Sequence, residues 1–143
     1  MPSNADLLAI KNELTHDPAD IGLTVLAADD EANADKLNLS RATIRVDRSY
    51  VSVSEIDFDR DEYAGLSPAD RAWLDLVTRS GAVKPASIRN DLNKAFGANT
   101  ATRASYEAAF TQQASRIQQM AALGIVAVSY VTPSDIANAR NAT

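Results

Sequence analysis

The amino-acid sequence predicts a mainly α protein, a small helical domain of five to seven short amphipathic helices with one or two short β-strands or extended segments. Three observations support this fold class. Of the 143 residues, 45% are apolar and 23% are charged, as in ordinary globular proteins. Apolar residues recur at spacings of three and four along most of the chain. Four short stretches carry the residue pattern of helix starts. At this length we expect a single domain, residues 1–143.

Three of the helix-start signals contain a proline. They are Asp17-Pro-Ala-Asp, Ser67-Pro-Ala-Asp and Thr132-Pro-Ser-Asp. In each, the first side chain can accept a hydrogen bond from a free N–H of the first turn, and proline fits the first helical position because no N–H is needed there. Ser3-Asn-Ala-Asp is a fourth signal without proline. We therefore expect a helix to begin after each of the four.

The helix after Ser3 carries its apolar residues on one face and ends at His16, and a second helix is expected over residues 29–37. The helix after Ser67 has the clearest pattern of all, and Gly81 ends it. Its apolar face consists of Ala69, Ala72, Trp73, Leu76 and Val77. A further helix ends at Gly97, in a C-cap role. The residues expected to be largely buried in the core are Trp73, Leu76, Leu92, Phe96 and Phe110.

Residues 102–123 contain neither glycine nor proline, which predicts one long helix or two helices with a break near Ser115. Residues 43–53 are rich in β-branched side chains and are expected to be extended. Residues 125–131 follow the C-capping Gly124 and are expected to form a strand, so that residues 125–143 form a strand-plus-helix segment. An exposed edge of either strand would allow another subunit to pair there.

Charge is unevenly distributed along a chain of net charge −5. The acidic N-terminal part, residues 1–40, holds eight acids and two bases, whereas residues 86–143 hold three acids and five bases. The acidic residues 1–40 of one subunit could attract the basic residues 86–143 of an identical subunit. Alternatively, these charged side chains could simply be exposed to solvent. The acidic balance makes direct nucleic-acid binding unfavourable, because nucleic-acid modules usually carry a basic patch.

The residues that could carry chemistry are few, and we expect no catalytic, cofactor-binding or metal-binding residues. Without cysteine there are no disulfides or thiolate ligands. The single histidine, His16, lies at an expected helix end, where the helix dipole explains it. Asp57, Asp59 and Asp61 resemble the start of a calcium loop, but Glu62 and Pro68 stand where that loop needs glycine and glutamate. We predict a non-enzymatic protein without cofactors.

No membrane or targeting segment is expected. The longest mainly apolar run near either end, residues 125–131, is far shorter than the roughly 20 residues that span a bilayer. The first residues lack the basic and apolar regions of a secretory signal.

Three blocks of the sequence resemble small uncharacterised proteins encoded among the virion structural genes of tailed bacteriophages and prophages. The blocks are Leu7-Leu-Ala-Ile-Lys-Asn-Glu-Leu-Thr-His-Asp-Pro-Ala-Asp-Ile-Gly-Leu23, Phe96-Gly-Ala-Asn-Thr-Ala-Thr-Arg-Ala-Ser105, and Ser115-Arg-Ile-Gln-Gln-Met-Ala-Ala-Leu-Gly124 with Val131-Thr-Pro-Ser-Asp-Ile-Ala-Asn-Ala-Arg140. They cover about half of the chain. The resemblance brings no functional residues with it.

The resemblance implies a virion structural protein, located in the virion and, during assembly, in the cytoplasm of the bacterial host. The favoured role is a head–tail connector subunit, either a neck adaptor or a head-completion protein. The alternatives are a capsid decoration (cement) protein and, in another class, a phage accessory or regulatory protein. The implied partners are portal, tail or capsid proteins and further copies of the chain, which could close as a ring.

Overall fold

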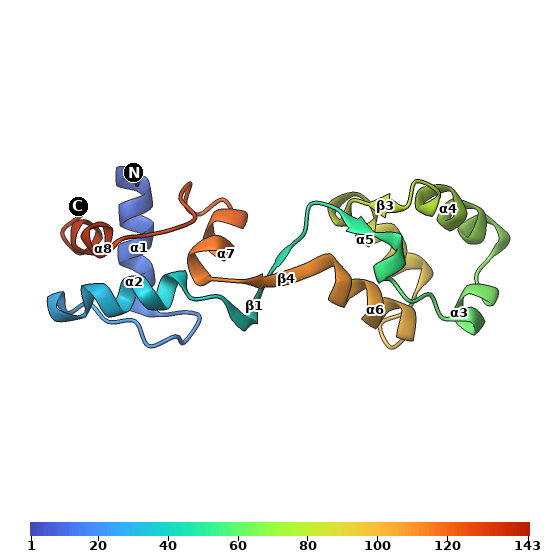
Figure 1. The fold of residues 1–143 in the computed structure, drawn as a ribbon, viewed down its shortest axis with the longest axis horizontal. Coiled ribbons are helices and arrows are strands. Elements are labelled where there is room, and N and C mark those ends of the chain that lie inside the picture. Colours follow the sequence, from blue (N-terminus) through green and yellow to red (C-terminus); the bar gives the residue numbers. More distant parts are fainter. The chain divides into compact units, whose positions relative to one another are not determined.

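The computed structural model describes residues 1–143 and contains eight α-helices and four short β-strands (Figure 1). The helices are α1 Asn4–His16, α2 Asp30–Asn38, α3 Arg60–Ala64, α4 Pro68–Thr78, α5 Pro85–Ala95, α6 Ala101–Phe110, α7 Arg116–Ala122 and α8 Pro133–Arg140. The strands are β1 Arg41–Asp47, β2 Val51–Ser52, β3 Ala82–Val83 and β4 Thr111–Ala114, and short 3-10 turns cover Ala27–Asp29 and Val53–Glu55. The mainly α class is confirmed.

The chain folds into two compact units where the sequence predicts one domain. Unit 1 comprises residues 1–46 and 113–143, and unit 2 comprises residues 47–112. Each unit has its own hydrophobic core, and no buried residue belongs to both. Sequence periodicity shows which face of each helix is apolar but not which faces meet, so it could not separate two cores within 143 residues.

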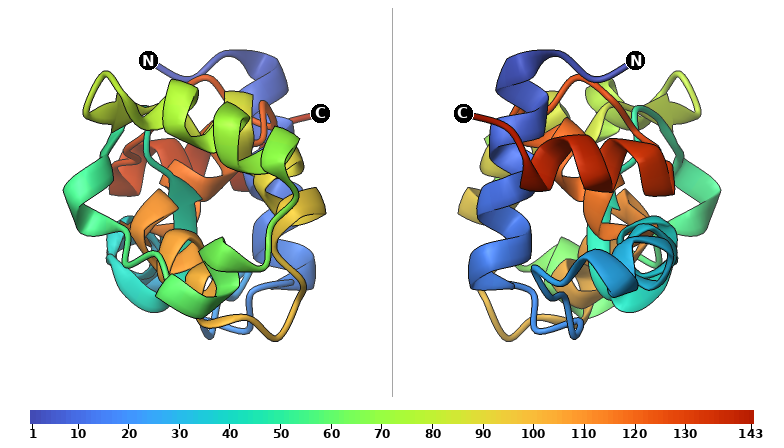
Figure 2. Two further views of the ribbon diagram at one scale, coloured as in Figure 1. Left: turned by 90° about the vertical axis from the view of Figure 1, so that its right-hand side faces the viewer. Right: turned by 90° about the vertical axis from the view of Figure 1, so that its left-hand side faces the viewer.

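Unit 1 is built from helices at both ends of the chain. Helix α8 packs against α1 and α2, and α7 packs against α2. The right-hand view of Figure 2 shows α8, in red, beside α1, in blue. The fully or almost fully buried side chains at the centre of this core include Ile10, Leu14, Leu37, Ile117, Met120, Val131 and Ile136. Helices from both ends therefore share one core.

Unit 2 contains α3, α4, α5 and α6 with a two-stranded antiparallel sheet in which Val51 of β2 pairs with Val83 of β3. Its core includes three neighbouring aromatic rings. The Phe96 and Tyr106 centroids are 6.5 Å apart, and those of Tyr106 and Phe110 are 5.3 Å apart. Such tilted ring contacts stabilise a core beyond the area they bury.

Three of the four predicted helix starts are confirmed. The side chains of Ser3, Ser67 and Thr132 each accept a hydrogen bond from the N–H three residues later. The fourth prediction, at Asp17, is wrong. Asp17 lies after α1 with a left-handed backbone (φ 42°), and its carboxylate accepts N–H groups of residues 21–23 instead. Its side chain stabilises the loop that follows α1, and no helix begins at this position.

The predicted strand at residues 125–131 is also wrong, because no backbone pairs with this segment. Side chains take the place of a strand partner. Asn38 donates to the carbonyl of Val131 and accepts its N–H, at 2.7 and 3.0 Å. The carboxylate of Asp6 accepts the N–H of Ala127 at 2.8 Å. Gly124 does end α7 as predicted, with φ 74° and the Ile125 N–H bonded to the Met120 carbonyl.

The predicted extended stretch at residues 43–53 is confirmed as β1 and β2, with three irregular residues between them. Residues 102–123 form two helices, and the predicted break falls at Ser115, which caps α7. Residues 111–114 are a strand, because β4 pairs with β1 and this tertiary pairing overrides helix propensity. Gly97 does not act as the expected C-cap, because Phe96, the residue after α5, is extended and Gly97 has no positive φ.

The core prediction holds for Leu92, Phe96 and Phe110, which are at most 1% exposed. It is wrong for Leu76, which is 61% exposed, and Trp73 is only partly buried. Helix α4 is turned so that Leu74, at 4% exposure, enters the core in place of Leu76. The apolar stripe of α4 is wider than the surface that covers it, so the pattern alone could not show which half is buried.

Substitutions in these two helices test this orientation. Leu92→Ala is expected to lower the free energy of unfolding by about 2–5 kcal/mol, because it leaves a cavity at a fully buried site. Leu76→Ala, the matched control, is expected to change it by less than about 0.5 kcal/mol in dilute protein. Chemical denaturation measures both. Equal costs would mean that the orientation of α4 is incorrect.

Candidate functional site

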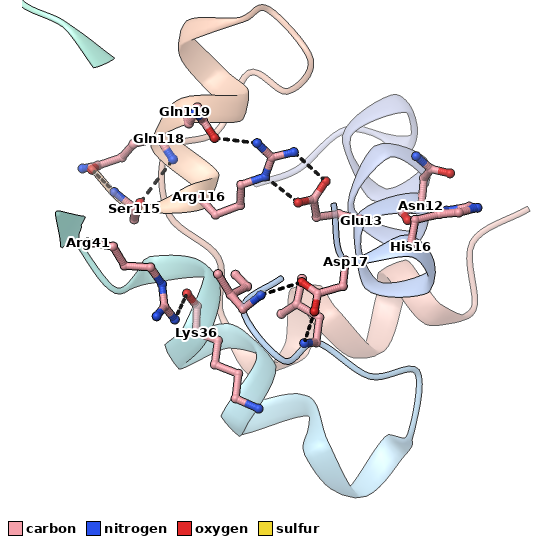
Figure 3. Close-up of polar contacts among 12 residues, drawn as sticks. Asn12, Glu13, His16, Asp17, Lys36, Arg41, Ser115, Arg116, Gln118 and Gln119 are labelled. Atoms are coloured by element: carbon pink, nitrogen blue, oxygen red, sulfur yellow. Dashed lines mark hydrogen bonds and ion pairs between the residues drawn. The ribbon is translucent and has the colours of Figure 1, made fainter. Parts of the chain in front are cut away.

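A buried ion pair joins the two ends of the chain inside unit 1. Glu13 of α1 accepts two hydrogen bonds from the Arg116 guanidinium of α7, at 2.5 and 3.1 Å. The two side chains are 5% and 13% exposed. Figure 3 shows the guanidinium between Glu13 and Gln119, whose side-chain oxygen accepts a third bond at 2.5 Å. Every oxygen of this carboxylate is used, so the pair is compensated although it is buried.

A second ion pair joins the same two parts of the chain. Arg140 of α8 donates to both carboxylate oxygens of Asp30 at the start of α2, at 2.7 and 2.8 Å. The hydrogen bond from Arg140 lowers the pKa of Asp30. Two of the five cations in residues 86–143 therefore pair with acids of residues 1–40 in the same chain. The charge asymmetry read from the sequence is satisfied in part within one subunit.

The side chain of Asn33 holds the loop before α2 in place. Asn33 is fully buried; its side-chain nitrogen donates to the carbonyl of Thr24, and its oxygen accepts the Thr24 N–H, at 2.8 and 3.1 Å. The Thr24 hydroxyl also donates to Asp29 at 2.8 Å. The next four residues, Val25-Leu-Ala-Ala28, are all exposed, with Val25 at 54% and Leu26 at 62%. Four consecutive exposed apolar residues are unusual unless they have a function.

A small pocket of about 130 Å³ lies beside this loop. Its lining residues are Lys11, Leu14, Thr15, Val25 and Arg140. The Lys11 ammonium donates to the carbonyl of Ala142 at 2.7 Å, which leaves two of its three N–H groups for other acceptors. The pocket thus combines an apolar wall with cationic groups next to the exposed apolar loop. We define residues 25–28 and this pocket as the loop surface.

Unit 2 has an apolar surface of its own on α4. Ala69, Ala72 and Leu76 of this helix are exposed, and Trp73 is partly buried beside them. An open groove of about 470 Å³ runs along the helix and is lined by Ala69, Asp70, Trp73, Asp91 and Lys94. The left-hand view of Figure 2 shows α4, in yellow-green, on the outside of its unit. We define these exposed residues and the groove as the α4 face.

The residues weighed from the sequence have structural roles. His16 is exposed in the last turn of α1, with Nδ1 2.9 Å from the carbonyl of Asn12. Asp59 caps α3 by accepting the N–H groups of Asp61 and Glu62. Glu62 in turn accepts the N–H groups of residues 101 and 102 at the start of α6. The acidic stretch of residues 57–62 therefore supports two helix starts.

The buried polar residues Glu13 and Asn33 are not singled out by the sequence, and the sequence shows Asp6 only as part of a helix-start signal. Asp6 and Glu13 lie at helical spacing from Ile10 on the apolar face of α1, and that position was the available signal. Their partners could not be read from the sequence, because Arg116 follows Glu13 by 103 residues.

Comparison with protein-family models, curated proteins and solved structures finds no match to this chain. No helix is long and apolar enough to span a membrane. No three His, Asp or Glu side chains are grouped as a metal ion would need.

A double-substitution cycle tests the buried ion pair. Glu13→Leu or Arg116→Met alone is expected to cost about 3 kcal/mol of unfolding free energy, because each leaves a buried charged group without its partner. Replacing both, by Glu13→Leu with Arg116→Met, is expected to recover most of that loss. Lys94→Met, which breaks an exposed pair with Asp91, is the control and should have little effect. Additive losses in the double variant would contradict the pairing.

The stability of the protein is expected to fall with pH below about 4. Hydrogen bonds from the N–H groups of Ala127 and Ser3 lower the pKa of Asp6, and Arg140 lowers that of Asp30. Both folded pKa values lie below the unfolded value of about 3.9, so this stabilisation is complete above that value. It is lost as the pH falls through the folded pKa values, because the unfolded state takes up protons first.

Denaturant unfolding between pH 6 and pH 3 measures this dependence. Asp30→Asn and Arg140→Gln remove the same ion pair from its two sides, and both are expected to flatten the acid limb of the profile. A profile as steep as that of the unaltered protein in both variants would show that this pair does not cause the dependence.

Proposed function

We propose that this protein is a non-enzymatic structural subunit of a tailed-bacteriophage virion and acts in the head–tail connector. The resemblance to proteins encoded among virion structural genes supports the virion role. Two of its three blocks, residues 7–23 and residues 115–124 with 131–140, lie in unit 1. They supply α1, α7 and α8, the helices that bring both chain ends into one core.

The observation that carries the proposal is the exposure of apolar residues on each of the two units, at the loop surface of unit 1 and at the α4 face of unit 2. The loop surface and the α4 face together expose Val25, Leu26, Ala72 and Leu76, with pockets beside them. Groups of exposed apolar residues are candidates for protein contacts. A subunit that acts by packing against portal, tail or capsid proteins would bury these side chains.

The loop surface suits a contact with a different virion protein. Two hydrogen bonds with Asn33 fix the backbone of Thr24, the residue before this loop. Little conformational entropy is therefore lost when a partner binds. The Lys11 ammonium of the adjoining pocket, which has one hydrogen bond to the Ala142 carbonyl, favours an acidic or carbonyl-rich segment of the partner. We therefore assign this surface to a neighbouring connector or portal protein.

Capsid decoration is the second candidate role. The α4 face, a second exposed apolar surface, would serve a subunit that packs against capsid proteins. The copy number separates the two roles, because a neck ring contains few subunits and a decorated capsid contains many.

Virions of the phage that encodes the chain provide the test. We expect mass spectrometry of purified particles to detect the protein, and negative-stain microscopy of a labelled chain to place it at the neck. Leu26→Asp is expected to reduce its incorporation at least tenfold, and Ala98→Asp, an equally polar change at another exposed site, is expected to have no effect. Absence of the chain from particles would refute the proposal, and label over the capsid surface would favour decoration.

A further inference from the structure

We propose that the pocket of the loop surface binds the carboxylate side chain of an acidic residue, glutamate in particular, from a partner protein. Lys11 is the cation that pairs with the carboxylate, and Val25 belongs to the apolar wall that covers the methylene groups. This inference rests on the proposed function, in which the loop surface contacts a neighbouring virion protein, and it names the chemistry that the contact recognises. All residues that line the pocket lie in unit 1.

Lys11 is the cation of the pocket whose charge lacks a counter-ion. Its ammonium donates to the Ala142 carbonyl at 2.7 Å and forms no ion pair. Arg140, the other cation of the pocket, is bonded to both carboxylate oxygens of Asp30, so its charge is offset. The pocket therefore has a net positive charge, although unit 1 as a whole has nine acidic and six basic side chains. Because the ammonium is only partly exposed, water screens its charge incompletely, and an anion is the favoured ligand.

The free N–H groups in the pocket narrow the choice of anion. One hydrogen bond occupies Lys11, which leaves two of its three N–H donors. The Nη1 group of Arg140 makes no hydrogen bond, because Asp30 is bonded to Nε and Nη2. Donors from two helices, α1 and α8, are thus available together. A carboxylate has two oxygens that only accept hydrogen bonds, and bonds between charged groups are the stronger kind.

The apolar wall and the volume of the pocket favour an organic carboxylate over an inorganic anion. Leu14 is 2% exposed and Val25 is 54% exposed, so a ligand with methylene groups would cover Val25 and gain from its burial. The pocket volume is about 130 Å³. A protein cavity of about 150 Å³ holds one benzene molecule, and the carboxylate and methylenes of a glutamate side chain are slightly smaller than benzene.

The position of the pocket beside the exposed loop points to a protein segment as the source of the carboxylate. Val25 lines the pocket and also begins the exposed run of residues 25–28, in which Leu26 is 62% exposed. A small free carboxylate would fill the pocket and leave Leu26 in water. Apolar residues that flank an acidic residue in a partner's segment would cover Leu26 at the same time. We therefore assign the pocket to an acidic side chain of a protein.

Capped amino acids test the pocket in the full chain. N-acetylglutamate amide is the probe, and N-acetylglutamine amide, which has nearly the same shape without the charge, is its control. At constant ionic strength we expect the glutamate probe to bind with a Kd of about 10 mM, as suits a ligand of this size, and to shift the NMR signals of the Leu14 and Val25 methyl groups. The glutamine control is expected to bind at least tenfold more weakly.

Two lysine variants test the role of Lys11. Lys11→Met, which removes the ammonium, is expected to weaken binding of the glutamate probe at least tenfold. Lys36→Met is the matched control, because Lys36 is also partly buried in unit 1 and also donates to a carbonyl at 2.7 Å, that of Gly22, but does not line the pocket. It is expected to leave binding unchanged. Circular dichroism confirms that both variants remain folded, and the comparison of the two probes needs no variant.

Several results would overturn the proposal. They are no binding of the glutamate probe at tenfold the expected Kd, equal binding of the two probes, equal effects of the two lysine variants, and displacement of the probe by sulfate at the same ionic strength. Butanoate that binds more tightly than the glutamate probe would identify a free carboxylate as the ligand and overturn the assignment to a protein. None of these results bears on whether the chain is present in virions, so the two proposals fail separately.

Discussion

The assembly of one unit from both ends of the chain is the constraint on which the rest of the structure depends. Neither α1 and α2 nor α7 and α8 can cover their apolar residues alone, and the shared core needs both. The buried pair of Glu13 and Arg116 strengthens this requirement, because each charge would be costly to bury without the other. Unit 1 therefore gains its main contacts only after a loop of more than 60 residues has been closed.

This constraint accounts for the irregular segments of unit 1. Residues 23–28 and 125–131 belong to no sheet, yet their backbone groups near the core need partners. The amides of Asn33 and Asn38 on α2 supply an N–H donor and an oxygen acceptor to Thr24 and Val131. A side-chain amide has the same donor and acceptor as a peptide group, so α2 serves both segments as an edge strand would.

Most local signals were predictable from the sequence, although those at Asp17 and Gly97 failed, and long-range pairing was not. The caps at Ser3, Ser67 and Thr132 and the break at Ser115 depend on residues three positions apart, and each is found. The strand predicted at residues 125–131 fails because its partners, Asp6 and Asn38, lie near the other end of the chain. The α4 orientation fails for a related reason: a wide apolar stripe does not reveal which half a distant core will cover.

Salt affects attraction between charges and burial of apolar surface in opposite ways. It screens the first, whereas excluded salts strengthen the second. Arg116 and Arg140 are held by Glu13 and Asp30, so they contribute little to attraction between copies. Charge steering between the acidic and basic ends is then weaker than the sequence suggests, and salt has less to screen. Burial of exposed apolar residues such as Leu26 and Leu76 would depend on the hydrophobic effect, which excluded salts such as sulfate strengthen. Because Arg116 and Arg140 are paired within the subunit, we expect any association of the chain to depend more on apolar burial than on attraction between its acidic and basic ends.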